Sequence, residues 1–78
     1  MKTIETLGQR LKTLRQEQGL PIDVLAYKAR CSTRTLILVE QWNLPPRRRK
    51  TRERIAHALG VSYEALWGEL EARGGASP

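Results

Sequence analysis

Apolar residues recur along this chain in short stripes with helical spacing, and turn-forming residues separate the stripes. Between residues 3 and 18 the apolar positions lie three or four residues apart, and Gly19 follows as a helix stop signal. These positions are Ile4, Leu7, Leu11 and Leu14. The pattern predicts a first helix over residues 3–18.

Residues 22–42 contain two shorter helical patterns around a tight turn. Leu25 and Ala29 lie four residues apart in the first, while Leu36 and Val39 lie three apart in the second. Between them Ser32 occupies a typical N-cap position, and the residues that follow it are polar. A short helix, a tight turn and a second helix with a polar leading end form a helix-turn-helix plan, whose second helix, here residues 33–41, enters a DNA major groove.

Two more helices are predicted after a loop at residues 43–51, where a proline pair excludes helix. The fourth covers residues 52–59 with Thr51 as its cap, and the fifth is capped by Ser62. The apolar face of the fifth helix comprises Tyr63, Leu66, Trp67 and Leu70. We therefore expect an all-α, five-helix domain over residues 1–73, followed by a flexible tail at 74–78.

Size and composition narrow the function. A chain of 78 residues forms one small domain, and its net charge of +6 suits a polyanionic partner. Cys31, the single cysteine, cannot form an internal disulfide, and no Cys/His spacing predicts a metal site or a cofactor. No nucleophile–base pair, secretory signal or membrane span is recognisable, which predicts a soluble cytoplasmic protein that is not an enzyme.

The order and spacing of these motifs resemble the lambda-repressor-like (Cro/XRE) helix-turn-helix family over about residues 4–70. The matching residues are Leu7 through Leu20, Leu25, Ala26, Ser32, Leu36, Val39, Glu40, Ile55 through Ser62 and Leu66. The resemblance implies a sequence-specific regulator of transcription that binds double-stranded DNA. The protein would be prokaryotic or encoded by a phage, and associated with the nucleoid. It implies a small repressor or Cro-like protein that binds a palindromic operator as a homodimer.

The same resemblance implies roles for individual residues. Base readout falls to the leading part of the helix at 33–41, at Ser32, Thr33, Arg34 and Leu38. An arginine can bond both O6 and N7 of guanine, and an apolar side chain can contact a thymine methyl group. In the family an arginine equivalent to Arg15 pairs with a glutamate equivalent to Glu40, which implies a structural ion pair here.

Phosphate contacts are expected next to that helix. The candidates are Arg30, Thr35, Arg47, Arg48, Arg49 and Lys50. The sequence also departs from the family: Pro21 and Ile22 replace polar residues that commonly touch phosphate. Arg30 replaces a glycine that often has positive φ, and Arg52 replaces an apolar residue, which predicts weaker packing of the fourth helix.

Two other functions remain open from the sequence alone. Ile37 and Leu38 stand where the family usually has polar groups, so they could form a protein-binding patch of an antitoxin or adaptor. The basic residues would equally serve a non-specific nucleic-acid binder. Apolar residues in excess of a small core predict the dimer interface, namely Trp42, Leu44, Trp67 and Leu70.

Overall fold

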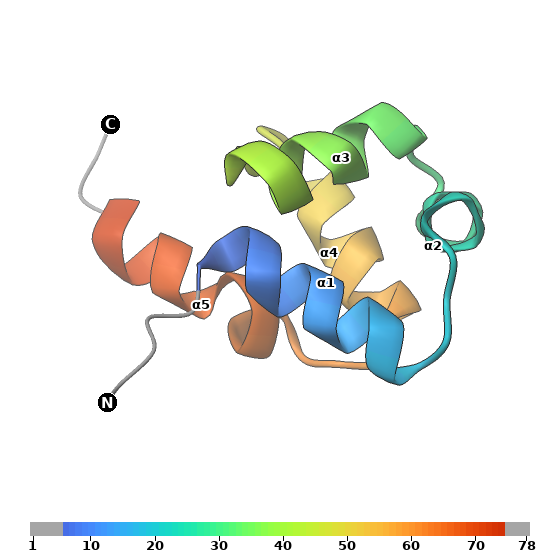
Figure 1. Cartoon of the computed structure of the whole chain (residues 1–78). Helices are drawn as coiled ribbons and strands as arrows, with labels where there is room; N and C mark the ends of the chain where they lie inside the picture. Colours follow the sequence, from blue (N-terminus) through green and yellow to red (C-terminus); the bar gives the residue numbers. More distant parts are fainter. Residues whose placement is uncertain (1–5, 75–78) are drawn as a thin grey trace.

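Five α-helices account for most of residues 6–74, the part of the chain that the computed structural model describes, with side chains described through residue 68. The helices are α1 (Leu7–Glu17), α2 (Ile22–Ala29), α3 (Thr33–Trp42), α4 (Arg49–Ala58) and α5 (Tyr63–Gly74). In Figure 1, α1 and α3 cross the front of the molecule, α4 lies behind them, and α2 is seen end-on at one side. The predicted all-α, five-helix fold is confirmed, while residues 75–78 of the expected tail lie outside the described residues.

The core draws on all five helices. Its fully or almost fully buried members are Leu11, Leu25, Ala26, Ala29, Leu36, Val39, Ile55, Ala56, Leu59, Leu66 and Trp67. Helix α3 packs on α1 and α2, and α4 packs on α2 and α5. The helix-turn-helix formed by α2 and α3 is therefore held between α1 on one side and α4 on the other, which leaves one face of α3 open to solvent.

Helices α1 and α3 approach most closely at Gly8. A Cβ atom at this position would collide with the backbone carbonyl oxygens of Val39 and Glu40. The N–H of Gly8 donates to Oδ1 of Asn43 at 2.8 Å, and Asn43 itself ends α3 with a left-handed backbone at φ 55°. One asparagine thus ends α3 and also satisfies an N–H in the first turn of α1, where intrahelical partners are lacking.

We expect Gly8→Ala to lower the free energy of unfolding by about 1–3 kcal/mol, because the added methyl group meets α3 backbone that cannot rotate away. Urea unfolding followed by circular dichroism measures the change. Gly68→Ala is the matched control, since a Cβ there meets only ordinary contacts in α5 and gains helix propensity. Equal effects of the two substitutions would contradict the close approach of α1 and α3.

Two of the predicted helix starts are wrong. Helix α1 begins at Leu7 rather than residue 3, because Thr6 and Gln9 form a capping box through reciprocal bonds of 3.2 and 3.3 Å. Ile4 lies outside the described residues. Helix α4 begins at Arg49 and not after Thr51, and its N-cap residue Arg48 makes no side-chain capping bond. Arg49 and Lys50 consequently belong to the first turn of α4 instead of the preceding loop.

The turn between α2 and α3 follows the prediction. Arg30 adopts the left-handed conformation with φ 57° and ψ 44°, and Cys31 is half-buried. The Oγ atom of Ser32 accepts from the N–H of Thr35 at 3.2 Å, and Ser62 caps α5 in the same way through Ala65. Both predicted serine caps are confirmed, and together they set the directions in which α3 and α5 leave their turns.

Trp67 does not lie on the surface, and its assignment to a dimer interface is wrong. Its side chain has no exposed area, and its Nε1–H donates to the backbone oxygen of Arg52 at 2.8 Å. The indole belongs to the core and bonds the backbone of α4, so it helps to hold α5 against α4. The side chain of Leu70 lies outside the described residues.

Candidate nucleic-acid interface

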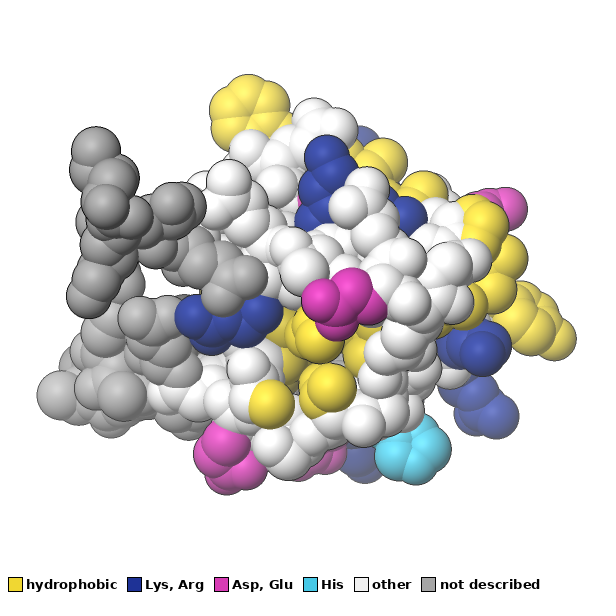
Figure 2. All heavy atoms as spheres, turned by 60° about the horizontal axis from the view of Figure 1, so that its bottom comes forward, with side chains coloured by type: hydrophobic (Ala, Val, Ile, Leu, Met, Phe, Trp, Pro, Cys, Tyr) yellow, Lys and Arg dark blue, Asp and Glu magenta, His cyan; other side chains and the backbone are white. Residues whose placement is uncertain are grey.

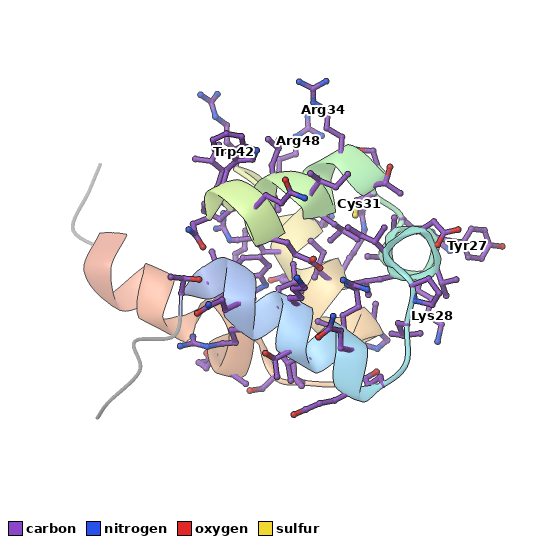
Figure 3. All side chains as sticks on the ribbon, in the orientation of Figure 1. Tyr27, Lys28, Cys31, Arg34, Trp42 and Arg48 are labelled. Carbon is purple, nitrogen blue, oxygen red and sulfur yellow. The ribbon has the colours of Figure 1, made fainter. Side chains whose placement is uncertain are left out.

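The open face of α3 carries the polar residues at its start. Thr33 and Arg34 are exposed, while Leu36 and Val39 point into the core, so the helix divides cleanly into two faces. Figure 3 shows the Arg34 side chain extending away from the body of the protein, with no neighbouring element in front of it. An arginine presented in this way at the end of a helix can reach the base edges of a major groove.

The two hydroxyl groups predicted to contact DNA around this helix start also bond each other. Oγ of Ser32 and Oγ1 of Thr35 lie 3.0 Å apart, and Ser32 in addition caps the helix. Ser32 is exposed and Thr35 is half-buried. Each hydroxyl retains acceptor capacity, but the pair first fixes the beginning of α3 and so the position of Arg34.

Ile37 and Leu38, adjacent in sequence, differ in exposure. Ile37 is 37% exposed on the open face of α3, whereas Leu38 is half-buried. Leu38 lines a shallow groove between α3 and the loop that precedes α4. The other residues of this groove are Thr35, Leu44, Pro45, Pro46, Arg47, Arg48 and Thr51.

An ion pair joins α1 to the last part of α3. Nε of Arg15 donates to Oε2 of Glu40 at 2.7 Å, and Nη2 donates to Oε1 at 3.2 Å. The remaining Nη1 donates to the backbone oxygen of Leu20 at 2.8 Å. The side chains of Arg15 and Glu40 are only 13% and 7% exposed. The pairing that the resemblance implies is thus present as a two-point contact at the edge of the core.

Arg52 anchors the loop before α4, which carries Arg47 and Arg48. Its Nη1 donates to the backbone oxygens of Pro46 and Arg47 at 2.6 and 3.0 Å, and its Nε donates to the hydroxyl of Tyr63 at 2.8 Å. The sequence predicted that Arg52 would weaken the packing of α4. These bonds instead tie Arg52 to the loop before α4 and to Tyr63. Sequence reasoning missed this role because two of the three acceptors are backbone carbonyls, which leave no signal in the residue pattern.

The basic residues predicted to contact phosphate divide into two kinds. Arg49 lies in α4 with its guanidinium 4.4 Å from the centre of the Tyr63 ring, and it also donates to Glu53 at 3.1 Å. Arg47, Arg48 and Lys50 are exposed, as Arg49 is, and no ion pair among the described residues involves these three. In Figure 3, Arg48 extends from the same side of the protein as Arg34. Arg34 and Arg48 thus place positive charge on one face of the protein.

The remaining predicted interface residues lie near the end of α3. Trp42 and Leu44 are 66% and 55% exposed. In Figure 3, Trp42 lies on the same side of the molecule as Arg48. Large apolar side chains with this exposure in a small domain are candidates for contact with a second protein surface.

The described residues were compared with the requirements of a metal site and of a cysteine nucleophile. No group of three or more His, Cys, Asp or Glu residues there could hold a metal ion. Burial raises the pKa of the Cys31 thiol, and the nearby Arg54 opposes this only in part. The thiol therefore stays protonated near neutral pH and is a poor nucleophile. No helix within the described part of the chain is long and apolar enough to cross a lipid bilayer.

The sequence and the fold were compared with those of known proteins. No protein-family model and no curated protein matches the sequence. Among solved structures, SinR from Bacillus subtilis, a master regulator for biofilm formation determined in complex with DNA, is 30% identical with a TM-score of 0.71. That match covers 78% of this chain and 97% of the SinR chain.

Two further structures agree with the first. The restriction-modification controller protein C.AhdI from Aeromonas hydrophila is 27% identical over 77% of this chain and 89% of its own, with a TM-score of 0.70. The clp gene regulator ClgR from Corynebacterium glutamicum is 28% identical over 91% of this chain and 72% of its own, with a TM-score of 0.69. The chain belongs to the lambda-repressor-like (Cro/XRE) helix-turn-helix family of DNA-binding transcriptional regulators.

Proposed function

We propose that this protein regulates transcription by sequence-specific binding of double-stranded DNA, with α3 in the major groove. The observation that carries the proposal is the common direction of Arg34, at the start of α3, and Arg48, at the start of α4 (Figure 3). SinR, with a similar fold, was determined in complex with DNA, which supports the same use of α3 here. Arg34 and Thr33 read bases in this arrangement, with Leu38 and Ser32 at the margin of the readout.

Phosphate binding falls chiefly to Arg47 and Arg48, because the anchored loop holds them beside α3. Arg52 fixes the carbonyl groups of Pro46 and Arg47, so the loop backbone is ordered before DNA arrives. Lys50, Arg30 and Thr35 can add contacts at the edge of this face, and Arg49 does so only by leaving the Tyr63 ring. Ordered basic groups bind phosphate with a smaller loss of conformational entropy than mobile ones.

Arg34→Ala and Arg48→Ala should affect DNA binding in different ways. Arg34→Ala should cost about 1–3 kcal/mol on the preferred site and relax preference at one base position. Arg48→Ala should weaken binding to all sequences alike and reduce the slope of log affinity against log salt concentration by about one. The measurement is fluorescence anisotropy on a site selected from a random DNA pool and on unrelated DNA, over a series of salt concentrations.

The control variant is Lys12→Ala, which removes an equal charge from the exposed surface of α1. Identical binding profiles for Arg34→Ala and Arg48→Ala would place base readout elsewhere. Failure of the random pool to yield any preferred sequence would favour the non-specific nucleic-acid binder instead.

We also propose that two copies bind a palindromic operator, with Trp42 and Leu44 contributing to the contact between them. One recognition helix reads only a few base pairs, so a second copy about one DNA turn away raises specificity. Trp42→Ala should lower affinity for a palindrome and leave affinity for an isolated half-site unchanged. Analytical ultracentrifugation of the complex gives its stoichiometry, and a 1:1 complex on a palindrome would exclude this dimer.

The proposal includes a regulatory and not an enzymatic role, in the cytoplasm of a prokaryote or phage-infected cell and associated with the nucleoid. The similar structures are transcriptional regulators from bacteria, which supports both statements. No cofactor is required by this function, because binding and release of DNA use the protein's own side chains.

A further inference from the structure

A second basic surface lies apart from the face marked by Arg34 and Arg48. It is a groove of about 560 Å³ between the end of α2 and one side of α4. The lining residues are Lys28, Arg30, Lys50, Glu53, Arg54 and His57. We call this surface the α2–α4 groove. The proposed DNA-binding function uses at most its edge, at Arg30 and Lys50.

Helical spacing gathers the basic residues of this groove on α4. Lys50, Arg54 and His57 follow one another at intervals of four and three residues, so they share one side of α4 over about 10 Å of helix. Lys28 and Arg30 face them from the last turn and the C-cap of α2, which packs on α4. Figure 2 shows the chain's one histidine and several Lys/Arg side chains along the same edge of the molecule.

The groove holds positive charge that the described part of the protein does not neutralise. Among the described residues, no ion pair involves Lys28, Arg30, Lys50 or Arg54. The one acid in the groove, Glu53, accepts a bond from Arg49 at 3.1 Å. Four cations gathered in this way repel one another and lower the stability of the folded state. A bound polyanion would relieve that repulsion, so the arrangement suits an acidic ligand.

A straight DNA duplex on α3 does not explain the groove. Figure 3 shows Lys28 extending in roughly the opposite direction from Arg34 and Arg48. A duplex lying against those two arginines would leave Lys28 on the far side of α2. The carboxylate of Glu53 within the groove also opposes a continuous phosphate backbone, whereas a polypeptide can place a neutral residue or an N–H group beside it.

An exposed aromatic residue next to Lys28 in the sequence favours a polypeptide further. Tyr27, adjacent in sequence to Lys28, is 85% exposed, and in Figure 3 its ring extends away from the body of the protein on the same side as Lys28. Tyrosine provides a large contact area at protein interfaces with little loss of conformational entropy. Cations next to one exposed ring match a partner segment that combines carboxylates with an apolar side chain.

We propose that the α2–α4 groove binds an acidic segment of a partner protein while the face of Arg34 and Arg48 holds DNA. This inference rests on the proposed DNA-binding function, because the two ligands are assigned to separate faces of one regulator. Occupation of the groove would connect DNA-bound protein to another component without displacing α3 from the major groove.

The test uses a fluorescein-labelled peptide of alternating glutamate and leucine residues, titrated with the full chain and followed by anisotropy. Lys28→Glu and Arg54→Glu should each lower peptide affinity about tenfold or more. Lys12→Glu on α1 and Arg34→Glu on α3 change the net charge equally and should have little effect on the peptide. Circular dichroism checks that all four variants fold. If Lys28→Glu or Arg54→Glu does not fold, the corresponding alanine variant, Lys28→Ala or Arg54→Ala, takes its place.

A second titration adds the selected duplex. The peptide should bind the protein–DNA complex as well as it binds the free protein, and Lys28→Glu should lower DNA affinity no more than Lys12→Glu. The proposal is overturned if no peptide binding is detected. It is also overturned if Lys12→Glu weakens peptide binding as much as Lys28→Glu does, if Arg34→Glu weakens peptide binding, or if DNA displaces the peptide. A large loss of DNA affinity in Lys28→Glu would assign the groove to DNA. Failure of the DNA-binding proposal would instead appear as absence of any preferred duplex, whatever the peptide does.

Discussion

Replacing Glu40 with alanine is expected to lower the free energy of unfolding by about 3–5 kcal/mol. The carboxylate receives two bonds from Arg15, and both side chains are largely shielded from water. Its removal leaves a guanidinium between α1 and α3 with only the Leu20 carbonyl as a partner among these contacts. For a domain of this length the total stability is about 4–12 kcal/mol, so the variant would be partly unfolded at physiological temperature.

A double-mutant cycle separates the ion pair from the volume of its side chains. Arg15→Met combined with Glu40→Leu removes both charges and keeps apolar volume, so it should be less destabilised than Glu40→Ala alone. Thermal and urea unfolding of the unmodified chain, Arg15→Met, Glu40→Leu and the double variant measure the coupling between the two residues. A Glu40→Ala protein that unfolds like the unmodified chain would show that the charge is solvated and that α3 is held by other contacts.

Trp67→Ala is expected to have a similarly large effect, about 3–5 kcal/mol, because it empties the largest fully buried side chain of the core. The indole lies where α4 meets α5, and its Nε1–H bond fixes the backbone of Arg52. Arg52 in turn anchors the loop that carries Arg47 and Arg48. The loss should therefore appear in stability first and in DNA affinity second.

Trp67→Phe is the matched variant for this prediction. It keeps most of the aromatic volume and removes the hydrogen bond to Arg52, which should cost about 1–3 kcal/mol. Urea unfolding compares the three proteins. If Trp67→Ala instead kept its stability and lost only operator affinity, the tryptophan would act at a dimer surface and its burial in the monomer would be contradicted.

Local sequence features were sufficient for most of the fold. Apolar spacing located all five helices, and the two serine caps marked where α3 and α5 begin. The starts of α1 and α4 were misplaced for different reasons. The capping box of Thr6 lies inside a longer apolar pattern, and the N-cap of α4 is an arginine without a capping bond, which gives no local signal.

The candidate site, like the fold, was predicted from the sequence only where it depends on local features. Position along a helix is a local property, so the exposure of Thr33 and Arg34 at the start of α3 followed from the buried stripe behind them. The burial of Trp67 could not follow from α5 alone, because it depends on how much space α4 leaves. For the same reason the sequence did not reveal that Leu38 lies against the loop while Ile37 stays exposed.

The sequence by itself determined the five helices, the helix-turn-helix pair and which side of each helix is apolar. These features depend on neighbours within one or two helical turns. The tertiary structure alone decided which groups meet: Gly8 with Asn43, Arg52 with the loop before α4, and the residues of the α2–α4 groove. Many of these contacts involve backbone carbonyl or amide groups, which every residue type carries. A residue pattern cannot encode a partner that any residue could supply, so only the packed structure identifies them.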